Sequence, residues 1–204
     1  MELYDSEEQQ VEAIKDWWKE NGKAVIVGAV IGLGGLFGWR FYQDSVTAAK
    51  EAASEDYSQA IQALSSNGVE AGADVQSFID GNKDSEYAVL AAMQLAKVQV
   101  EAGNLDEALA QLEWAKTATE DEALKTVITF RVARLHAEQG DYDTALTNLS
   151  NITAESWSGR VAELRGDISL RKGDTAAAYA AYTEAQQAND ASQGLQMKLD
   201  DLAK

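Results

Sequence analysis

The strongest hydrophobic pattern in the chain is an uninterrupted apolar run from Ala24 to Trp39, AVIVGAVIGLGGLFGW. In a helix this run spans about 24 Å, a little short of the roughly 30 Å core of a bilayer. Extension to Tyr42 supplies the missing length if the Arg40 guanidinium reaches the headgroups. The run has no polar stripe, which the core helix of a soluble protein would show. We therefore predict a transmembrane helix over residues 24–42.

The flanks of the run distinguish a retained span from a cleaved signal peptide. A signal peptide has a short basic leader and small residues at its cleavage site. Here 23 residues, seven of them acidic, precede the run, and Trp39-Arg40-Phe41-Tyr42 follows it. The basic residues near the two ends are Lys15, Lys19 and Lys23 before the span, and Arg40 and Lys50 after it. The positive-inside rule then favours a cytoplasmic N-terminus, with the larger C-terminal part across the membrane.

Glycines inside the span have the spacing of a helix contact face. Two GxxxG pairs occur, with a further glycine one turn beyond the first pair, and the glycines concerned are Gly28, Gly32, Gly34, Gly35 and Gly38. Small residues four apart let two helix backbones approach closely in lipid. We favour a lateral contact at this face, the alternative being that glycine only fills the span.

Residues 1–23 precede the span and read as a short amphipathic helix. Ser6 and Gln9 have the spacing of a capping box, and Asn21-Gly22 is a stop signal. The apolar positions are Val11, Ile14 and Trp18, with Trp17 beside them. Two interpretations remain open: a helix resting on the membrane surface, or simple aromatic anchoring of the span.

Beyond the span, residues 43–204 contain a recurring turn that predicts paired helices. The three copies begin at Gly103, Gly140 and Gly173, and their sequences are GNLDEA, GDYDTA and GDTAAA. We expect each glycine to end one helix in the left-handed conformation, the next residue to cap the following helix, and Ala108, Ala145 and Ala178 to let the paired helices approach closely. Helical patterns also cover residues 45–64 and 73–79, a degenerate first unit, and residues 191–202, a capping helix.

The repeat period, 37 and 33 residues between turn glycines, resembles that of the tetratricopeptide repeat, a unit of two helices and about 34 residues. The predicted fold is therefore all-α: a short cytoplasmic helix, a single transmembrane helix, and a tetratricopeptide-like solenoid.

Charge narrows the possible partners. The chain carries a net charge of −17 and no cysteine. Residues 41–204 hold 13 basic and 27 acidic residues, a net charge of −14. Such a domain repels phosphate backbones, so nucleic acid is not an expected partner.

Residues suited to catalysis are scarce. The one histidine, His136, has no nucleophile or cluster of metal ligands near it in sequence. No phosphate-binding glycine loop, zinc signature or calcium loop occurs. We therefore expect a non-catalytic protein with no metal and no cofactor.

Stacked helix pairs present a concave surface, to which the first helix of each repeat contributes. On the repeat register, the residues expected to bind protein partners there are Met93, Lys97, Phe130, Arg134 and Arg171. The alternative is that Met93 and Phe130 pack between helices and the basic residues pair with nearby acids.

Short motifs over nearly the whole length give the chain a family resemblance. They are Gln10-Val11-Glu12-Ala13, Glu20-Asn21-Gly22-Lys23-Ala24, Gly38-Trp39-Arg40, Leu95-Ala96, Arg131-Val132-Ala133-Arg134, Arg165-Gly166-Asp167 and Lys172-Gly173-Asp174. With these motifs the chain resembles the ancillary SecYEG translocon subunits of the YfgM type.

This resemblance implies an inner-membrane protein with a cytoplasmic N-terminus and a periplasmic repeat domain. It also implies partners: the SecYEG translocon, the membrane-anchored periplasmic chaperone PpiD, and client polypeptides. The function it implies is an adaptor that links emerging secretory proteins to periplasmic chaperones. The alternative function is a membrane-bound negative regulator of a stress-response signalling protein.

Overall fold

The computed structural model describes residues 7–202, and within that range every regular element is helical. The chain divides into two compact units, residues 1–52 and residues 53–204. Residues 7–52 of the first unit are the N-terminal part of one long helix, and the second unit contains the repeats. The prediction of an all-α fold is confirmed.

Helix α1 (Glu7–Asn67) contains the predicted span and continues well beyond both of its ends. The prediction that Asn21-Gly22 ends a separate helix is wrong, because both residues are helical. The Trp18 indole lies over Gly22, so that a Cβ atom there would be 3.2 Å from the ring. The Asn21 side chain donates a hydrogen bond to the Trp17 carbonyl one turn back, at 3.0 Å. Here glycine makes room for a ring instead of ending the helix. Ser6 of the predicted capping box lies outside the described residues.

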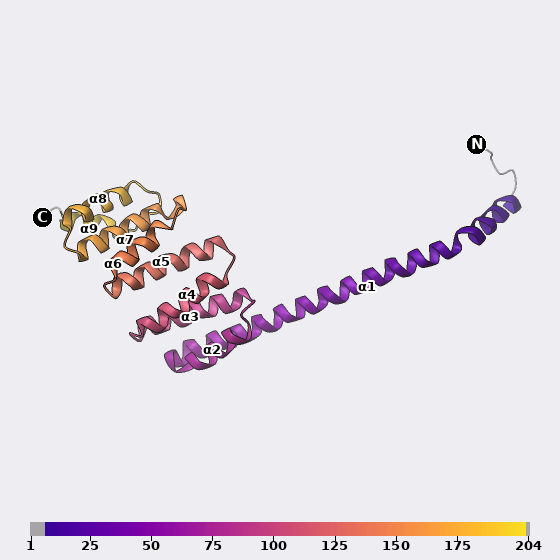
Figure 1. Cartoon of the computed structure of the whole chain (residues 1–204), viewed down its shortest axis with the longest axis horizontal. Helices are drawn as coiled ribbons and strands as arrows, with labels where there is room; N and C mark the ends of the chain where they lie inside the picture. The colour runs from indigo at the N-terminus through magenta and orange to yellow at the C-terminus, as the bar shows by residue number, and fades with distance from the viewer. Residues whose placement is uncertain (1–6, 203–204) are drawn as a thin grey trace. The chain divides into compact units, whose positions relative to one another are not determined.

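The repeat region consists of helices joined by short turns (Figure 1). The end of α1 leads through the 3₁₀ turn η1 (Gly68–Ala71) into α2 (Gly72–Gly81). Three helix pairs follow, and their members are α3 (Glu86–Glu101) with α4 (Leu105–Ala118), α5 (Glu122–Glu138) with α6 (Tyr142–Ser150), and α7 (Ser158–Arg171) with α8 (Thr175–Gln186). A second 3₁₀ turn, η2 (Glu155–Trp157), precedes α7, and α9 (Leu195–Leu202) ends the described chain.

The three predicted turns have the expected backbone conformation. Gly103, Gly140 and Gly173 have φ angles of 83°, 81° and 83°, in the left-handed region where glycine avoids a steric penalty. Asp141 and Asp174 cap the following helices by accepting hydrogen bonds from Thr144 N and Ala177 N. The prediction of a side-chain cap at Asn104 is wrong, because its side chain makes no capping bond.

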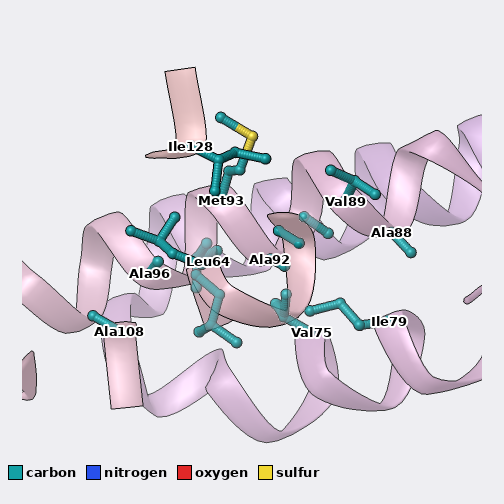
Figure 2. Close-up of a cluster of buried hydrophobic side chains, with 14 of the residues drawn as sticks. Leu64, Val75, Ile79, Ala88, Val89, Ala92, Met93, Ala96, Ala108 and Ile128 are labelled. Atoms are coloured by element: carbon teal, nitrogen blue, oxygen red, sulfur yellow. The ribbon is translucent and has the colours of Figure 1, made fainter. Parts of the chain in front are cut away.

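The core of the repeat region lies between the helix pairs. Ala108, Ala145 and Ala178 are completely buried, as predicted from their place in the turn motif. Figure 2 shows Leu64, at the end of α1, in the same cluster as Val75 and Ile79 of α2. The degenerate first unit therefore packs as a helix pair, although it lacks the turn motif.

A polar contact between neighbouring pairs recurs at equivalent positions. The Asp106 carboxylate of α4 accepts a hydrogen bond from the Gln139 side chain, at the end of α5, at 2.7 Å. One repeat later, the Asp143 carboxylate of α6 accepts one from Lys172, at the end of α7, at 3.0 Å. These bonds fix the start of each second helix to the end of the following first helix.

The last repeat packs most closely. Gly166 of α7 lies against the Tyr182 ring of α8, and a Cβ atom at Gly166 would overlap that ring. Helix α9 begins four residues later than predicted, and the loop before it caps α7. There, Asp190 accepts hydrogen bonds from Gly159 N at 2.8 Å and Arg160 N at 3.3 Å. Asp190 therefore caps α7 from a distant part of the chain.

Candidate interaction surfaces

The apolar segment of α1 is the first candidate surface. Among the described residues, one helical segment is long and apolar enough to cross a membrane, and none of that segment is buried. The exposed side chains include Ile26, Ile31, Phe37 and Trp39. An exposed apolar surface of this length is typical of a helix that lies in lipid.

The continuous helix places the glycines of the span on two sides. At about 100° per residue, Gly28, Gly32 and Gly35 share one side, and Gly34 and Gly38 lie roughly 100° around the helix. No atom lies within 4 Å of a Cβ built at any of the five positions. The glycines therefore leave two open strips along the helix, and their role as a contact face stays a prediction.

The N-terminal part of α1 carries a second apolar strip. Val11, Ile14, Trp17 and Trp18 are all exposed, and the two indoles lie 6.4 Å apart. Because the helix continues without a break from these residues into the span, they extend the same rod and do not form a separate surface helix.

The predicted partner-binding residues divide into buried and exposed groups. The prediction that Met93 projects from the surface is wrong, because its side chain is only 7% exposed. Figure 2 shows Met93 beside Ile128 of α5, in the core between repeats. Phe130 is half-buried and packs against the neighbouring core cluster. The alternative interpretation, packing between helices, is the correct one for these two residues.

The basic residues of the predicted surface also differ from one another. Lys97 is exposed and lies 3.7 Å from Glu101 on the same helix. Arg171 bridges two repeats, donating to the Ala137 carbonyl at 3.0 Å and to Glu138 at 2.8 Å. Arg134 is exposed and has no hydrogen-bond or ion-pair partner among residues 7–202. Of the three, Arg134 is the most available to a partner.

A basic and aromatic surface on α5 and the start of α7 was not predicted as a unit. Arg131 is exposed and, like Arg134, has no ion-pair partner in the described part of the chain. The ring centroids of Phe130 and Trp157 lie 5.3 Å apart. The Arg160 guanidinium carbon lies 4.8 Å from the centroid of the Trp157 ring. We call these five residues the α5 patch. Spacing within α5 could have indicated Arg131, but only tertiary packing brings Trp157 and Arg160 to Phe130.

In the third repeat, the positions equivalent to Phe130 and Arg134 are Glu163 and Asp167, and the chain itself occupies them. Lys198 of α9 contacts Glu163 at 2.9 Å and the two Asp167 carboxylate oxygens at 2.6 and 2.8 Å. The Tyr182 hydroxyl donates to Asp167 at 2.7 Å. This surface of the last repeat is therefore closed by α9.

The pKa values of this cluster follow from its packing. Burial, followed by the hydrogen bond to Asp167, raises the pKa of the Tyr182 hydroxyl far above its usual range. Burial by itself lowers the pKa of Lys198, but the bonds to Asp167 and Glu163 outweigh it, so that the pKa is raised. Both groups stay protonated at neutral pH, and the cluster is a structural clamp.

The one histidine, His136, lies beside the cap of α6. The His136 Nδ1 atom lies 3.6 Å from Asp141, the residue that caps α6. Within residues 7–202, no three histidine or acidic side chains are close enough together to hold a metal ion.

The fold and these surfaces define a class: helical-repeat proteins with an N-terminal candidate membrane helix. The family model for a tetratricopeptide repeat-like domain matches residues 15–204, and the chain belongs to that family. A crystal structure of a tetratricopeptide repeat protein from Parabacteroides merdae superposes with a TM-score of 0.60 at 14% identity, covering 75% of this chain and 60% of that one. This likeness supports the repeat fold.

More closely related sequences identify the particular family. The chain is 38% identical to the ancillary SecYEG translocon subunit of Escherichia coli, over 100% of both chains. It is 36% identical to the protein of the same name from Haemophilus influenzae, over 96% of this chain and 97% of the relative. The chain belongs to the family of ancillary SecYEG translocon subunits, as its motifs indicated.

Proposed function

We propose that the protein is a non-catalytic accessory subunit of the SecYEG translocon. The observation that carries this proposal is the full-length similarity, at 38% identity, to a protein of that name. The repeat fold is consistent with the proposal, because stacked helix pairs offer extended surfaces for protein contacts. The exposed span of α1 would hold the protein beside a channel in the same membrane.

We further propose an inner-membrane location with a cytoplasmic N-terminus and a periplasmic repeat domain. Three lysines before the span against Arg40 and Lys50 after it support this orientation. Protease added to spheroplasts should then digest the repeat region. Digestion only in inverted vesicles would reverse the orientation.

The finer role we propose is to bring emerging polypeptides and a membrane-anchored chaperone of the PpiD type to the channel. The α5 patch supports this role in chemical terms. Among residues 7–202, Arg131 and Arg134 have no acidic partner, although residues 41–204 carry a net charge of −14. Phe130 and Trp157 offer aromatic surface beside them. A hydrophobic segment with acidic flanks would pair its acids with the arginines and pack its apolar residues against the aromatic rings. In this proposal, Lys97 lies at the position of the preceding repeat that is equivalent to Arg134, and it extends the basic surface. Met93 and Arg171 instead stabilise the packing between helices.

Crosslinking and mass spectrometry on intact membranes would test the accessory role. We expect crosslinks from the repeat region and the ends of the span to SecYEG subunits. A single-pass protein with an unrelated span, produced at the same level, is the control for random encounters. Crosslinks that gather on a signalling regulator instead would favour the alternative function and contradict the translocon proposal.

A further inference from the structure

The outer side of a second helix is the side that faces the next repeat. On α8 this side differs from the outer sides of α4 and α6. In α4, Leu105 and Leu109 pack into the core cluster that includes Ile128 of α5. In α6, the equivalent Tyr142 and Leu146 pack into the cluster that includes Leu164 and Ile168 of α7. In both cases the first helix of the next repeat covers the outer side of the second helix.

Among residues 7–202, no such helix covers the same positions of α8. The equivalents there are Thr175 and Tyr179, and Tyr179 is 49% exposed. Helix α9 lies beside α8 (Figure 1), but it is eight residues long, against 17 for α5 and 14 for α7. Its buried residues, Leu195 and Leu199, cluster with Tyr182 and Ala185. The cap therefore covers the end of α8 that follows Tyr179 and leaves the first two turns open.

The residues around Tyr179 are unlike those of a solvated end. Terminal repeats of solenoids usually carry a polar outer face, which keeps them soluble. Ala176 of α8 is at the position that Asp106 occupies in α4 and Asp143 occupies in α6. Ala176, Ala177 and Ala180 are all exposed. The third repeat has thus replaced the acid that joins neighbouring repeats with an apolar residue.

We propose that the outer side of α8, centred on Tyr179, binds an amphipathic helix from another protein. The two covered interfaces in this chain indicate what that helix must offer. Helices α5 and α7 bring aliphatic residues at helical spacing: Leu124 and Ile128 in the first, and Val161, Leu164 and Ile168 in the second. The bound helix would lie beyond α9, where the later turns of the first helix of a fourth repeat would pack.

The surface fits another protein better than a second copy of this chain. A second copy pairing through the same side would present alanine and Tyr179, not an aliphatic row. Two repeat domains of net charge −14 would also repel each other. This inference goes beyond the proposed function, because it would hold for a helix of any other protein.

Site-specific photocrosslinking in the full-length chain, in native membranes, would test the site. The photoreactive residue p-benzoylphenylalanine would replace Tyr179, and the crosslinked peptides would be sequenced by mass spectrometry. The matched control places the same residue at Thr147, an exposed position of α6 beside the covered Leu146. We expect position 179, and not 147, to crosslink to an amphipathic helix of another protein with aliphatic residues at i, i+3 or i+4, and i+7.

A second variant separates loss of the site from loss of the fold. Thr175→Glu places a charge in the proposed interface, because the equivalent residues Leu105 and Tyr142 are covered by the next repeat. An acidic residue in the first turn of a helix should leave helical content unchanged. We expect it to reduce crosslinking from position 179 by about tenfold or more. Crosslinks to α8 of a second copy, equal crosslinking at 147 and 179, or full crosslinking in the Thr175→Glu variant would each overturn the proposal. Whether the crosslinked protein belongs to the translocon is a separate result, which tests the proposed function and not this one.

Discussion

The Lys198 ammonium lies 2.6 and 2.8 Å from the two carboxylate oxygens of Asp167, and this contact fixes the last helix to the last repeat. Glu163 adds a third charged contact at 2.9 Å. Helix α9 is short and buries Leu195 and Leu199, and the charged contacts of Lys198 add to that packing.

Removing that side chain should loosen α9. In Lys198→Met, Asp167 and Glu163 lose their shared cation, and we expect a loss of about 1 kcal/mol, the upper part of the range for partly exposed ion pairs. Hydrogen exchange of the α9 amides should quicken more than that of α3. The control, Lys172→Met, breaks a more exposed pair with Asp143 and should have a smaller effect. Equal exchange in α9 before and after the change would show that apolar packing alone holds the helix.

Because Asp141 caps α6 as a carboxylate, we expect the stability of the fold to decrease at acid pH. Hydrogen bonds from Thr144, with a smaller Coulombic contribution from His136, hold the pKa of Asp141 below its ordinary value of 3.8. A depressed pKa stabilises the fold above pH 3.8, and this stabilisation is lost as the pH falls through the lower value of the folded state. Asp141→Asn keeps a capping oxygen but removes the charge. Its melting temperature should lie below that of the parent at pH 6, and the difference should shrink as the pH falls below 3.8. A constant difference would assign the effect to packing.

The contact between Gly166 and Tyr182 predicts sensitivity to one methyl group. Gly166→Ala places a Cβ atom in the Tyr182 ring, so the ring or α7 must move. We expect a loss of about 1–3 kcal/mol in the free energy of unfolding, as for other overpacked cores. Gly81→Ala in α2 is the control, because no atom lies within 4 Å of its Cβ position. Denaturant unfolding measures both, and an unchanged midpoint for Gly166→Ala would contradict the close packing described.

The glycines of the span predict a loss of lateral contact. The pair of changes Gly28→Leu and Gly32→Leu keeps the segment apolar but separates any helix that approaches that side. Insertion should be unaffected, and recovery of membrane partners after detergent extraction should fall. The control pair, Ile26→Leu and Val30→Leu, changes the opposite side. Equal recovery in both variants would mean that the glycines only fill the span.

The α5 patch predicts a loss of binding on charge reversal. Arg131→Glu and Arg134→Glu together should leave melting nearly unchanged, because both side chains are exposed and unpaired within the described chain. Crosslinks from the repeat region to its partners should decrease. The matched control, Lys50→Glu with Lys83→Glu, makes the same change of charge at exposed positions elsewhere. Arg171 is left intact, because it joins α7 to α5. Retained crosslinks in a folded variant would exclude the patch.

Local rules were enough to predict the helix pairs and the turns between them. The left-handed conformation at Gly140 and the cap at Asp141 depend on residues adjacent in sequence, and both were predictable. The apolar run of the span was equally plain, because length and composition define it. The same local rule failed at Gly22, where the Trp18 ring, one turn away, makes glycine useful inside a helix.

The interaction surfaces depended on contacts between distant residues. Periodicity placed Met93 and Arg134 on the same helix face, one repeat apart, but packing against Ile128 buries the first and leaves the second exposed. The capping of α7 by Asp190 and the contact of Lys198 with Asp167 join positions about 30 residues apart. The sequence alone determined the elements, since helix and turn formation are local. Only the tertiary structure decided which side chains remain available to a partner, since burial depends on what the rest of the chain covers.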